Sequence, residues 1–358
     1  MKNKKKVVVA MSGGVDSSVV AGILKEEGYE VIGVTLQLYN SKQEIKTKTC
    51  CSGIDIYDAK DVARKLDIPH YVLNYKKIFK ETVIDNFIDS YRRGFTPIPC
   101  VQCNQYIKFN DLLKTAKGLG ADFLATGHYI RKKEYKNRVA LYRAKDKTKD
   151  QSYFLFQIKE NDLGFLKFPL GDYLKNETRA LAKRYGIPNA DKPESQDICF
   201  IPDGNYRNFL SKFKGFNKEG NILDQDNNII GKHGGIENYT VGQRKRLNIF
   251  NKEPLYVTKI KESDNSIVVG QKKDLNSQEI FIDKLNWIGS KRKYYKNICE
   301  DLFIKVRARQ IPIKGCLQFL ENHQGRVILD DSAHSVAKGQ GCVFYNKNDQ
   351  LLGGGWII

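Results

Sequence analysis

Short apolar runs alternate with helical patterns through the first half of the chain. Lys6–Ala10 predicts a buried strand, and Ser17 to Glu27 predicts a helix that ends before Gly28. Repeated strand–helix units predict a mostly parallel sheet with helices on both faces, an α/β fold. The other elements predicted here are strands Val31–Leu38, His70–Leu73 and Phe123–Thr126, and helices Asp55–Leu66, Glu81–Arg93 and Lys108–Gly118.

Beyond about residue 205 the pattern changes to short alternating segments separated by turn signals such as Asp226-Asn227-Asn228. Such segments are typical of small β domains. The predicted strands include Leu255–Ile260, Ser266–Val269, Phe303–Ala308 and Arg326–Leu329. We therefore predict three domains: an α/β domain over 1–205, a small mostly β domain over 206–280, and a β-barrel-like domain over 281–358.

A glycine-rich string, Ser-Gly-Gly-Val-Asp-Ser-Ser, follows the first strand and opens the first helix at residues 12–18. Its glycines allow a sharp turn and a close approach to a ligand, and the free N–H groups of a helix start attract an anion. Asp16 would repel phosphate unless it caps the helix or faces a magnesium ion. The alternative is an ordinary strand-to-helix turn with a serine cap. The string is not G-x-x-x-x-G-K-[ST], so it predicts a phosphate loop of another type.

The net charge adds a second indication. The chain has 60 Lys and Arg against 41 Asp and Glu, a formal charge of +19. Such an excess favours a polyanionic partner, although a lysine-rich background composition is the alternative. Basic residues gather over 131–149, over 244–246 and around Arg307 and Arg309, which would share one face of a strand. No run of 18 apolar residues and no signal-peptide pattern occurs, so we expect a cytoplasmic protein without a membrane partner.

The cysteines suggest chemistry at two places. Cys100 and Cys103 form a C-x-x-C between prolines and a helix predicted to begin near Gln105, where the helix start would stabilise a thiolate. By itself the pair is compatible with a redox couple, metal ligands or core packing. Cys199, taken alone, is as compatible with a buried structural cysteine as with a functional one. Three more are predicted to be small core hydrophobes: Cys299, Cys316 and Cys342.

The glycine string resembles the SGGxDS signature of the PP-loop ATP pyrophosphatases, which bind ATP and adenylate a carbonyl oxygen with release of pyrophosphate. Further strings over nearly the whole chain occur in the order found in the bacterial tRNA-specific 2-thiouridylase (MnmA) family. They are Cys50-Cys51-Ser52, Pro99-Cys100-Val101-Gln102-Cys103-Asn104 with Ile107-Lys108-Phe109, Ala125-Thr126-Gly127-His128-Tyr129, Lys149-Asp150-Gln151-Ser152-Tyr153-Phe154, Ile198-Cys199-Phe200, Thr240-Val241-Gly242-Gln243-Arg244 and Gly353-Gly354-Gly355.

The resemblance implies a PP-loop domain of the adenine nucleotide alpha-hydrolase type, followed by two small mostly β domains. It implies ATP-dependent 2-thiolation of the wobble uridine of tRNA, expected for the Lys, Glu and Gln tRNAs, with ATP and Mg²⁺. Adenylation would make the uracil 2-oxygen a good leaving group. Cys199 would carry sulfur as a persulfide, received from a sulfur-relay protein or a cysteine desulfurase. Cys103 would act with it as nucleophile and resolving thiol, and Asp16 would serve the adenylation step.

The resemblance also implies binding residues. His128 is either a general base or a packed or phosphate-facing histidine, and the pair Cys50-Cys51 is interpreted as structural. The implied ATP-binding residues are Ala10, Met11, Ser12, Gly13, Gly14, Val15, Asp16, Ser17, Leu36 and Gly127. The implied tRNA-binding residues are Ile98, Pro99, Cys100, Lys149, Asp150, Gln151, Arg307 and Ala308.

One position departs from the family pattern, since many members carry aspartate where this chain has Cys100. A second hypothesis is therefore that Cys100, Cys103 and Cys199 hold three irons of a 4Fe-4S cluster with one open corner. Two other functions are alternatives: a PP-loop ligase or amidotransferase acting on a small molecule, and a non-catalytic RNA-binding protein. The paired cysteines disfavour the former, and the intact glycine loop disfavours the latter. The sequence does not decide between persulfide and cluster.

Overall fold

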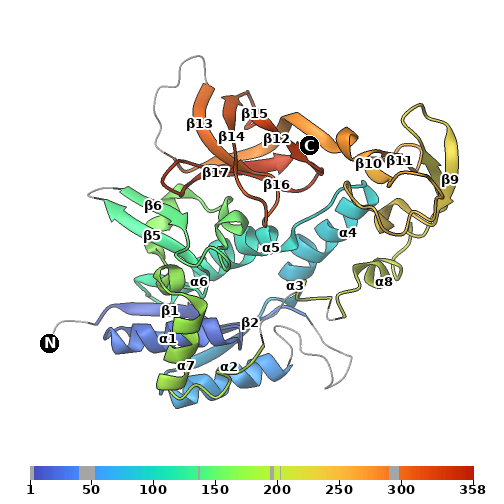
Figure 1. The fold of residues 1–358 in the computed structure, drawn as a ribbon. Helices are drawn as coiled ribbons and strands as arrows, with labels where there is room; N and C mark the ends of the chain where they lie inside the picture. The colour runs from blue at the N-terminus through green and yellow to red at the C-terminus, as the bar shows by residue number, and fades with distance from the viewer. Residues whose placement is uncertain (1–3, 40–52, 136–137, 194–196, 202, 290–297) are drawn as a thin grey trace. The chain divides into compact units, whose positions relative to one another are not determined.

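The structure is a computed structural model of the chain that describes residues 4–39, 53–135, 138–193, 197–201, 203–289 and 298–358 (Figure 1). Cys50 and Cys51 lie outside the described residues. The chain divides into two compact units. The first comprises residues 1–84, 100–204 and 349–351, and the second comprises residues 85–99, 205–348 and 352–358. The predicted domain edges at 205 and 280 stay a prediction.

A parallel sheet with strand order β3-β2-β1-β4-β7 forms the centre of the first unit. The apolar run predicted as the first strand is buried in the middle of this sheet, where both faces are covered. Its strands are β1 Lys6–Ala10, β2 Glu30–Gln37, β3 His70–Asn74, β4 Phe123–Ala125 and β7 Leu166–Lys167. The predicted α/β fold is confirmed.

The strand order places a crevice at the carboxyl ends of β1 and β4. From β1 the chain runs outward to β2 and β3, and it then returns to β4 on the other side of β1. Ligands of open α/β sheets bind where the strand order reverses in this way. The glycine string follows β1 and Gly127 follows β4, so both lie at that crevice.

Apolar side chains of α1 fill the space between the helix and the sheet, together with residues of α2 and α7. The helices of this unit are α1 Val15–Glu26, α2 Gly53–Lys65, α3 Lys76–Phe79, α6 Leu113–Gly118 and α7 Lys175–Arg184, with π-helical η1 at Lys80–Ile84. A hairpin, β5 Ile130–Tyr135 and β6 Arg138–Arg143, and 3₁₀ turns η3 Ser152–Leu155, η4 Glu160–Phe165 and η5 Pro169–Asp172 complete it.

One predicted helix begins earlier than expected. The segment predicted as Lys108–Gly118 is helical from Pro99, through α5 Pro99–Gln102, η2 Cys103–Leu112 and α6. Proline is favoured in the first helical turn because its missing N–H would have no partner there. The expectation that Cys103 lies at a helix start is therefore wrong, since a full turn precedes it.

The second unit contains α4 Asp85–Arg92, α8 Tyr206–Leu210, η6 Ile236–Asn238 and η7 Lys272–Leu275. One sheet has the order β10-β11-β8-β9, formed by β8 Gly220–Leu223, β9 Ile229–His233, β10 Tyr256–Lys261 and β11 Ser266–Gly270. Its apolar core includes Ile222, Val257 and Ile267.

A closed barrel forms the rest of this unit, because β12 pairs with both β15 and β17. Its strands are β12 Asn276–Trp287, β13 Ile298–Lys305, β14 Ile313–Phe319, β15 Gly325–His334, β16 Gly341–Tyr345 and β17 Gln350–Ile357. Cys299 and Cys342 are buried in its core, and Cys316 is half-buried. No helix within the described ranges is long and apolar enough to cross a membrane.

Candidate nucleotide and sulfur-transfer site

Two glycines allow the glycine loop to approach its neighbours closely. Gly13 has φ +74°, and a Cβ there would lie 2.2 Å from the carbonyl oxygen of Asp55. A Cβ on Gly127 would lie 2.9 Å from the backbone nitrogen of Ser17. Larger residues at either position would push these segments apart. The sequence therefore closes the crevice so that the start of α1 faces the loop after β4.

Two pockets meet at this crevice, and Ser12, Asp16 and Gln151 line both of them. The first pocket is lined by Ala10, Met11, Ser12, Asp16, Ser17, Val34, Leu36, Leu38, Cys103, Lys108, Thr126, Gly127, His128 and Gln151. The second pocket is lined by Ser12, Gly14, Val15, Asp16, Asp55, Tyr129, Lys149, Gln151, Lys175, Lys192 and Pro193. Of the residues predicted to bind ATP, all but Gly13 line at least one of the two pockets.

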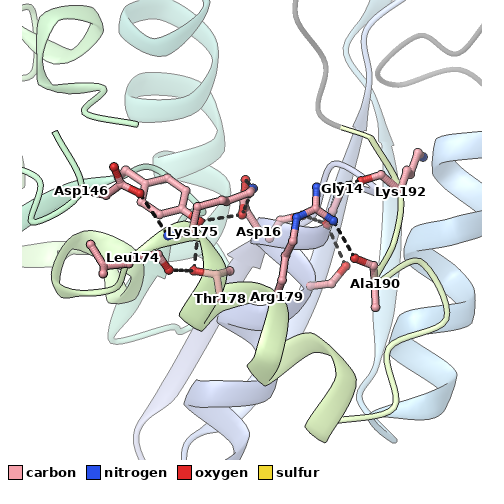
Figure 2. Close-up of polar contacts among 12 residues, drawn as sticks. Gly14, Asp16, Asp146, Leu174, Lys175, Thr178, Arg179, Ala190 and Lys192 are labelled. Carbon is pink, nitrogen blue, oxygen red and sulfur yellow. Dashed lines mark hydrogen bonds and ion pairs between the residues drawn. The ribbon is translucent and has the colours of Figure 1, made fainter. Parts of the chain in front are cut away.

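Asp16 is held in place by an ion pair (Figure 2). The ammonium of Lys175 lies 2.7 and 2.9 Å from its two carboxylate oxygens, and the hydroxyl of Tyr129 donates to it at 2.9 Å. Lys175 is the first residue of α7, and its backbone N–H donates to Asp146. The helix cap considered for Asp16 is not made by its side chain; instead Lys175 cancels its charge, which reduces the repulsion that it would exert on phosphate.

Lys192 fixes the glycine loop from the opposite side. Its ammonium donates to the carbonyl of Gly13 at 3.2 Å and to the carboxylates of Asp55 and Asp58 at 2.5 Å each. Burial opposes its charged form, but the hydrogen bonds to the Asp55 and Asp58 carboxylates and their charges outweigh that effect and raise the pKa of Lys192. Asn189 donates to the same Gly13 carbonyl at 2.7 Å. These contacts fix the backbone of the glycine loop at Gly13, next to the second pocket.

The cationic side chains of the second pocket match a polyphosphate. Lys149, Lys175 and Lys192 reach it from three segments, and the N-terminal end of α1 also faces it. Oriented N–H groups and ammonium groups together stabilise phosphate oxygens. The apolar Val34, Leu36 and Leu38 line the first pocket, as a nucleobase requires.

His128 lies in the first pocket as a neutral imidazole. Burial lowers the pKa of His128 well below its ordinary value, and the positive charge of Lys108 lowers it further. The ring packs against Phe109 and Phe168, and Nδ1 lies 2.7 Å from the hydroxyl oxygen of Thr126. Both the packed histidine and the general base considered for this residue are compatible with that environment.

The predicted sulfur-transfer cysteines differ in their surroundings. Cys103 is buried and lines the first pocket, and burial raises the pKa of its thiol while the charge of Lys108 opposes the rise. Cys100 is exposed and Cys199 is half-buried. Among the described residues, no group of three or more His, Cys, Asp or Glu side chains is arranged to hold a metal ion.

The segment around Cys199 is anchored beside the first pocket. The hydroxyl of Tyr39 donates to the carbonyl of Cys199 at 2.6 Å, and Phe200 packs edge-on against Phe79. Tyr39 directly follows Leu38, which lines the first pocket. Two segments that are far apart in the sequence therefore meet at the end of β2.

In the loop predicted to contact tRNA at 149–151, the side chains of two residues accept hydrogen bonds from the rest of the first unit. The carboxylate of Asp150 accepts from Arg143 Nε at 3.1 Å and from the backbone of Ala144 at 3.0 Å, and its side chain is almost fully buried. The side chain of Gln151 accepts from Tyr129 N at 2.9 Å. Asp150 thus fixes the loop, and Lys149 is the member whose charge is directed to the pocket. Ile98 and Pro99 are buried.

The strand predicted at Phe303–Ala308 ends at Lys305, so Arg307 and Arg309 do not share a strand face. They lie in a turn because the ammonium of Lys305 folds the chain back by donating to the carbonyl of Ala308 at 2.5 Å. The guanidinium of Arg307 donates to the carbonyls of Ser335 and Val241 at 2.8 and 2.9 Å. Arg309 is exposed. Arg307 therefore has a structural role within the second unit.

Sequence reasoning did not single out Lys175 and Lys192. Both are lysines in a chain that contains many basic residues, and neither lies in a recognisable string. Lys175 follows a 3₁₀ turn and begins a helix, which gives no signal of a ligand. Only the fold brings them within reach of Asp16 and Gly13.

Family profiles match the chain in consecutive segments. A profile described as a tRNA methyl transferase HUP domain matches residues 5–203, one described as a tRNA methyl transferase PRC-barrel domain matches 207–271, and one described as an aminomethyltransferase beta-barrel domain matches 277–357. A solved 4-thiouridine synthetase–RNA complex with bound ATP is 19% identical over 58% of this chain and 50% of that chain, with a TM-score of 0.32. That likeness is too weak to support a conclusion.

Curated relatives are far more similar. The tRNA-specific 2-thiouridylase MnmA of Orientia tsutsugamushi (strain Boryong) is 51% identical over 99% of this chain and 96% of the relative. The protein of the same name from Rickettsia prowazekii (strain Madrid E) is 51% identical over 98% of each chain. Since the identity extends over both units, and the glycine loop and both predicted cysteines are in place, the chain belongs to the tRNA-specific 2-thiouridylase MnmA family.

Proposed function

We propose that this protein is an ATP-dependent tRNA sulfurtransferase that replaces the 2-oxygen of the wobble uridine by sulfur. The observation that carries the proposal is the junction of the two pockets. The second pocket has the cations and the helix start for a triphosphate, and the first contains the buried thiol of Cys103. Membership of the MnmA family supports uridine in tRNA as the substrate.

Adenylation would take place where the pockets meet. Lys149, Lys175 and Lys192 would bind the phosphates, and Leu36 would pack on the adenine. The uracil 2-oxygen would attack the α-phosphorus, so that the oxygen–phosphorus bond forms and pyrophosphate leaves. Mg²⁺ would arrive with ATP and screen the phosphate charge; Asp16 and Asp55 are the carboxylates that line the second pocket.

Sulfur transfer would then use both cysteines. The terminal sulfur of a Cys199 persulfide attacks carbon 2 of the adenylated base, and AMP leaves with the former uracil oxygen. The Cys103 thiolate attacks the Sγ of Cys199, which forms a Cys103–Cys199 disulfide and releases the 2-thio group to the base. A thiol reductant resets the disulfide. The persulfide comes from a sulfur-relay protein or a cysteine desulfurase.

We prefer this persulfide scheme to a 4Fe-4S cluster held by Cys100, Cys103 and Cys199. One of the three is exposed, one is buried and one is half-buried, and they are not gathered as a ligand set within the described part of the chain. The persulfide scheme requires only that Cys103 and Cys199 meet, and the anchoring of Cys199 beside the first pocket favours that.

The test of the function is pyrophosphate release measured with and without tRNA, followed by mass spectrometry of the digested tRNA. We expect release that depends on tRNA with a wobble uridine, and a 2-thiouridine nucleoside once a persulfide donor is added. Release with a small molecule in place of tRNA would instead indicate a PP-loop ligase. Binding of tRNA with no pyrophosphate from any substrate would indicate a non-catalytic RNA-binding protein.

A loop of the second unit is expected to bind tRNA by base stacking. The side chain of Phe250 is 99% exposed, and the groove beside it is lined by Arg244, Arg246 and Lys252. Phe250→Ala should weaken tRNA binding by about 1–3 kcal/mol without changing its salt dependence, because stacking releases no counterions. Filter binding at several salt concentrations measures both quantities. Ile229→Ala, at another exposed apolar residue of the second unit, is the control and should change neither.

Arg307 and Arg309 allow a charge contact to be separated from a structural one. Arg309→Gln should lower the slope of log affinity against log salt by about 0.9 if it contacts one phosphate. Arg307→Gln should lower the melting temperature as well, because two backbone carbonyls lose their donor. If the slope of log affinity against log salt is unchanged in both variants, this turn is not part of the tRNA interface.

A further inference from the structure

The helix that carries Cys103 contains an unusual segment. From Cys103 to Leu112, ten residues form a π-helix between the α-helical ends Pro99–Gln102 and Leu113–Gly118. π-Helical hydrogen bonds join residues five apart, and such segments are mostly single turns that occur often at functional sites. A run of ten residues therefore requires an explanation beyond helix propensity.

The π-helix decides which side chains share a face. An α-helix completes a turn in about 3.6 residues, so residues five apart point to different sides. A helix with bonds between residues five apart has a wider turn and returns the fifth residue to nearly the same side. Cys103 and Lys108 are five apart, and both line the first pocket.

Lys108 differs from the other cations of the site. Lys149, Lys175 and Lys192 line the second pocket, whereas Lys108 lines the first. Lys175 is paired with Asp16, and Lys192 with Asp55 and Asp58. Within the described part of the chain, Lys108 forms no salt bridge. It therefore brings an uncompensated positive charge to the pocket that contains the thiol.

We propose that Lys108 is a positioning residue for sulfur transfer, and that the π-helix places its ammonium to stabilise the thiolate of Cys103 as it attacks the Sγ of Cys199. The proposal rests on the proposed function, since the thiolate is needed only if Cys103 is the resolving nucleophile. Lys108 touches neither the base nor the phosphates in this role; it acts through Cys103.

The surroundings of Cys103 show why a cation is needed. Burial raises the pKa of the thiol, which disfavours the nucleophilic form at neutral pH, and Lys108 opposes that rise. The other ionisable groups that line this pocket are His128, which burial keeps neutral, and Asp16, whose charge Lys175 cancels. Among these groups, Lys108 is the one that can favour the thiolate.

The test separates adenylation from sulfur transfer in Lys108→Met and Lys108→Gln, with Lys108→Arg as the conservative variant. Lys114→Met is the matched control, because Lys114 is an exposed lysine near the end of the same helix. In single turnover with a persulfide donor, we expect 2-thiouridine formation at pH 7 to slow at least tenfold in the first two variants. Pyrophosphate release should change far less, and Lys108→Arg should recover most of the rate.

A second measurement needs no substrate. Alkylation of Cys103 by iodoacetamide is followed against pH by mass spectrometry of its peptide. Removing the cation should move the midpoint to higher pH, by about one unit for a tenfold effect. Lys108→Arg and Lys114→Met should keep the midpoint of the unchanged protein. The two neutral variants also differ in shape, so a folding defect in one leaves the other to be measured.

The proposal is wrong if the midpoint is unchanged in the folded neutral variants, or if pyrophosphate release falls as much as thiolation. The latter result would make Lys108 a phosphate ligand. Failure of the proposed function looks different, since the unchanged protein would then release no pyrophosphate with tRNA while its alkylation profile could still depend on Lys108.

Discussion

Asp16→Ala is expected to reduce tRNA-dependent pyrophosphate release by on the order of 100-fold or more, with tRNA binding retained. Asp16 lines both pockets and connects the start of α1 to Lys175 and Tyr129. Without the carboxylate, the Lys175 ammonium loses its fixed position, and the phosphates lose a properly placed cation. Pyrophosphate release at saturating ATP and tRNA, together with filter binding of tRNA, measures the two effects.

Two further variants sharpen this experiment. Lys175→Met should show a similar loss, because it removes the other half of the ion pair and leaves Asp16 facing the phosphates uncompensated. Asp191→Ala is the control, since its carboxylate is 88% exposed and forms only a 3.8 Å pair with Lys183. A rate for Asp16→Ala close to that of the unchanged protein would reduce Asp16 to a structural residue, and the role proposed for it would fail.

The parts of the fold that were predictable are those with a strong local pattern. Lys6–Ala10 and the helix after it were predicted because a continuous apolar run, a glycine turn and a closing glycine act over a few residues. The strand predicted at Phe303–Ala308 belongs to β13, which ends at Lys305, three residues before the predicted end. Alternation alone does not reveal that Lys305 turns the chain back onto the carbonyl of Ala308.

The helix around Cys103 shows a different limit. Two prolines suggested a loop, but one proline can instead begin a helix, and that choice depends on packing against the rest of the unit. The π-helical register had no sequence signal at all. For the same reason the proximity of Lys108 to Cys103 could not be predicted, although Lys108 lies in a string that marked the family.

Residues of the candidate site could be predicted where they belong to a sequence motif. Residues that reach the site only through the tertiary structure could not. Ser12, Gly14, Leu36 and Gly127 each line at least one of the two pockets, and their binding of ATP stays a prediction. Lys175 and Lys192 approach from segments more than 150 residues away in sequence from the glycine loop, and only the tertiary structure brings them together. The prediction that a helix start stabilises the Cys103 thiolate was wrong, because the thiol is buried and one helical turn precedes it.

Cys103→Ser and Cys199→Ser are each expected to abolish 2-thiouridine formation while tRNA-dependent pyrophosphate release continues. The reason is chemical: the hydroxyl of serine neither carries a persulfide nor displaces sulfur from one. Cys100→Asp should keep most of the activity, because Cys100 is exposed and has no step in the persulfide scheme. Single-turnover assays with a persulfide donor and ATP compare the three variants.

The same variants decide between persulfide and cluster. The protein is purified aerobically, freed of iron and supplied with a persulfide donor, ATP and tRNA. We expect full thiolation and a persulfide on Cys199 by mass spectrometry. In the cluster scheme, Cys100→Asp would replace a soft thiolate by a hard carboxylate and weaken iron retention. The persulfide scheme would be overturned if thiolation appears only after anaerobic iron reconstitution and is impaired in Cys100→Asp. Cys103 and Cys199 would then be insufficient for sulfur transfer without iron.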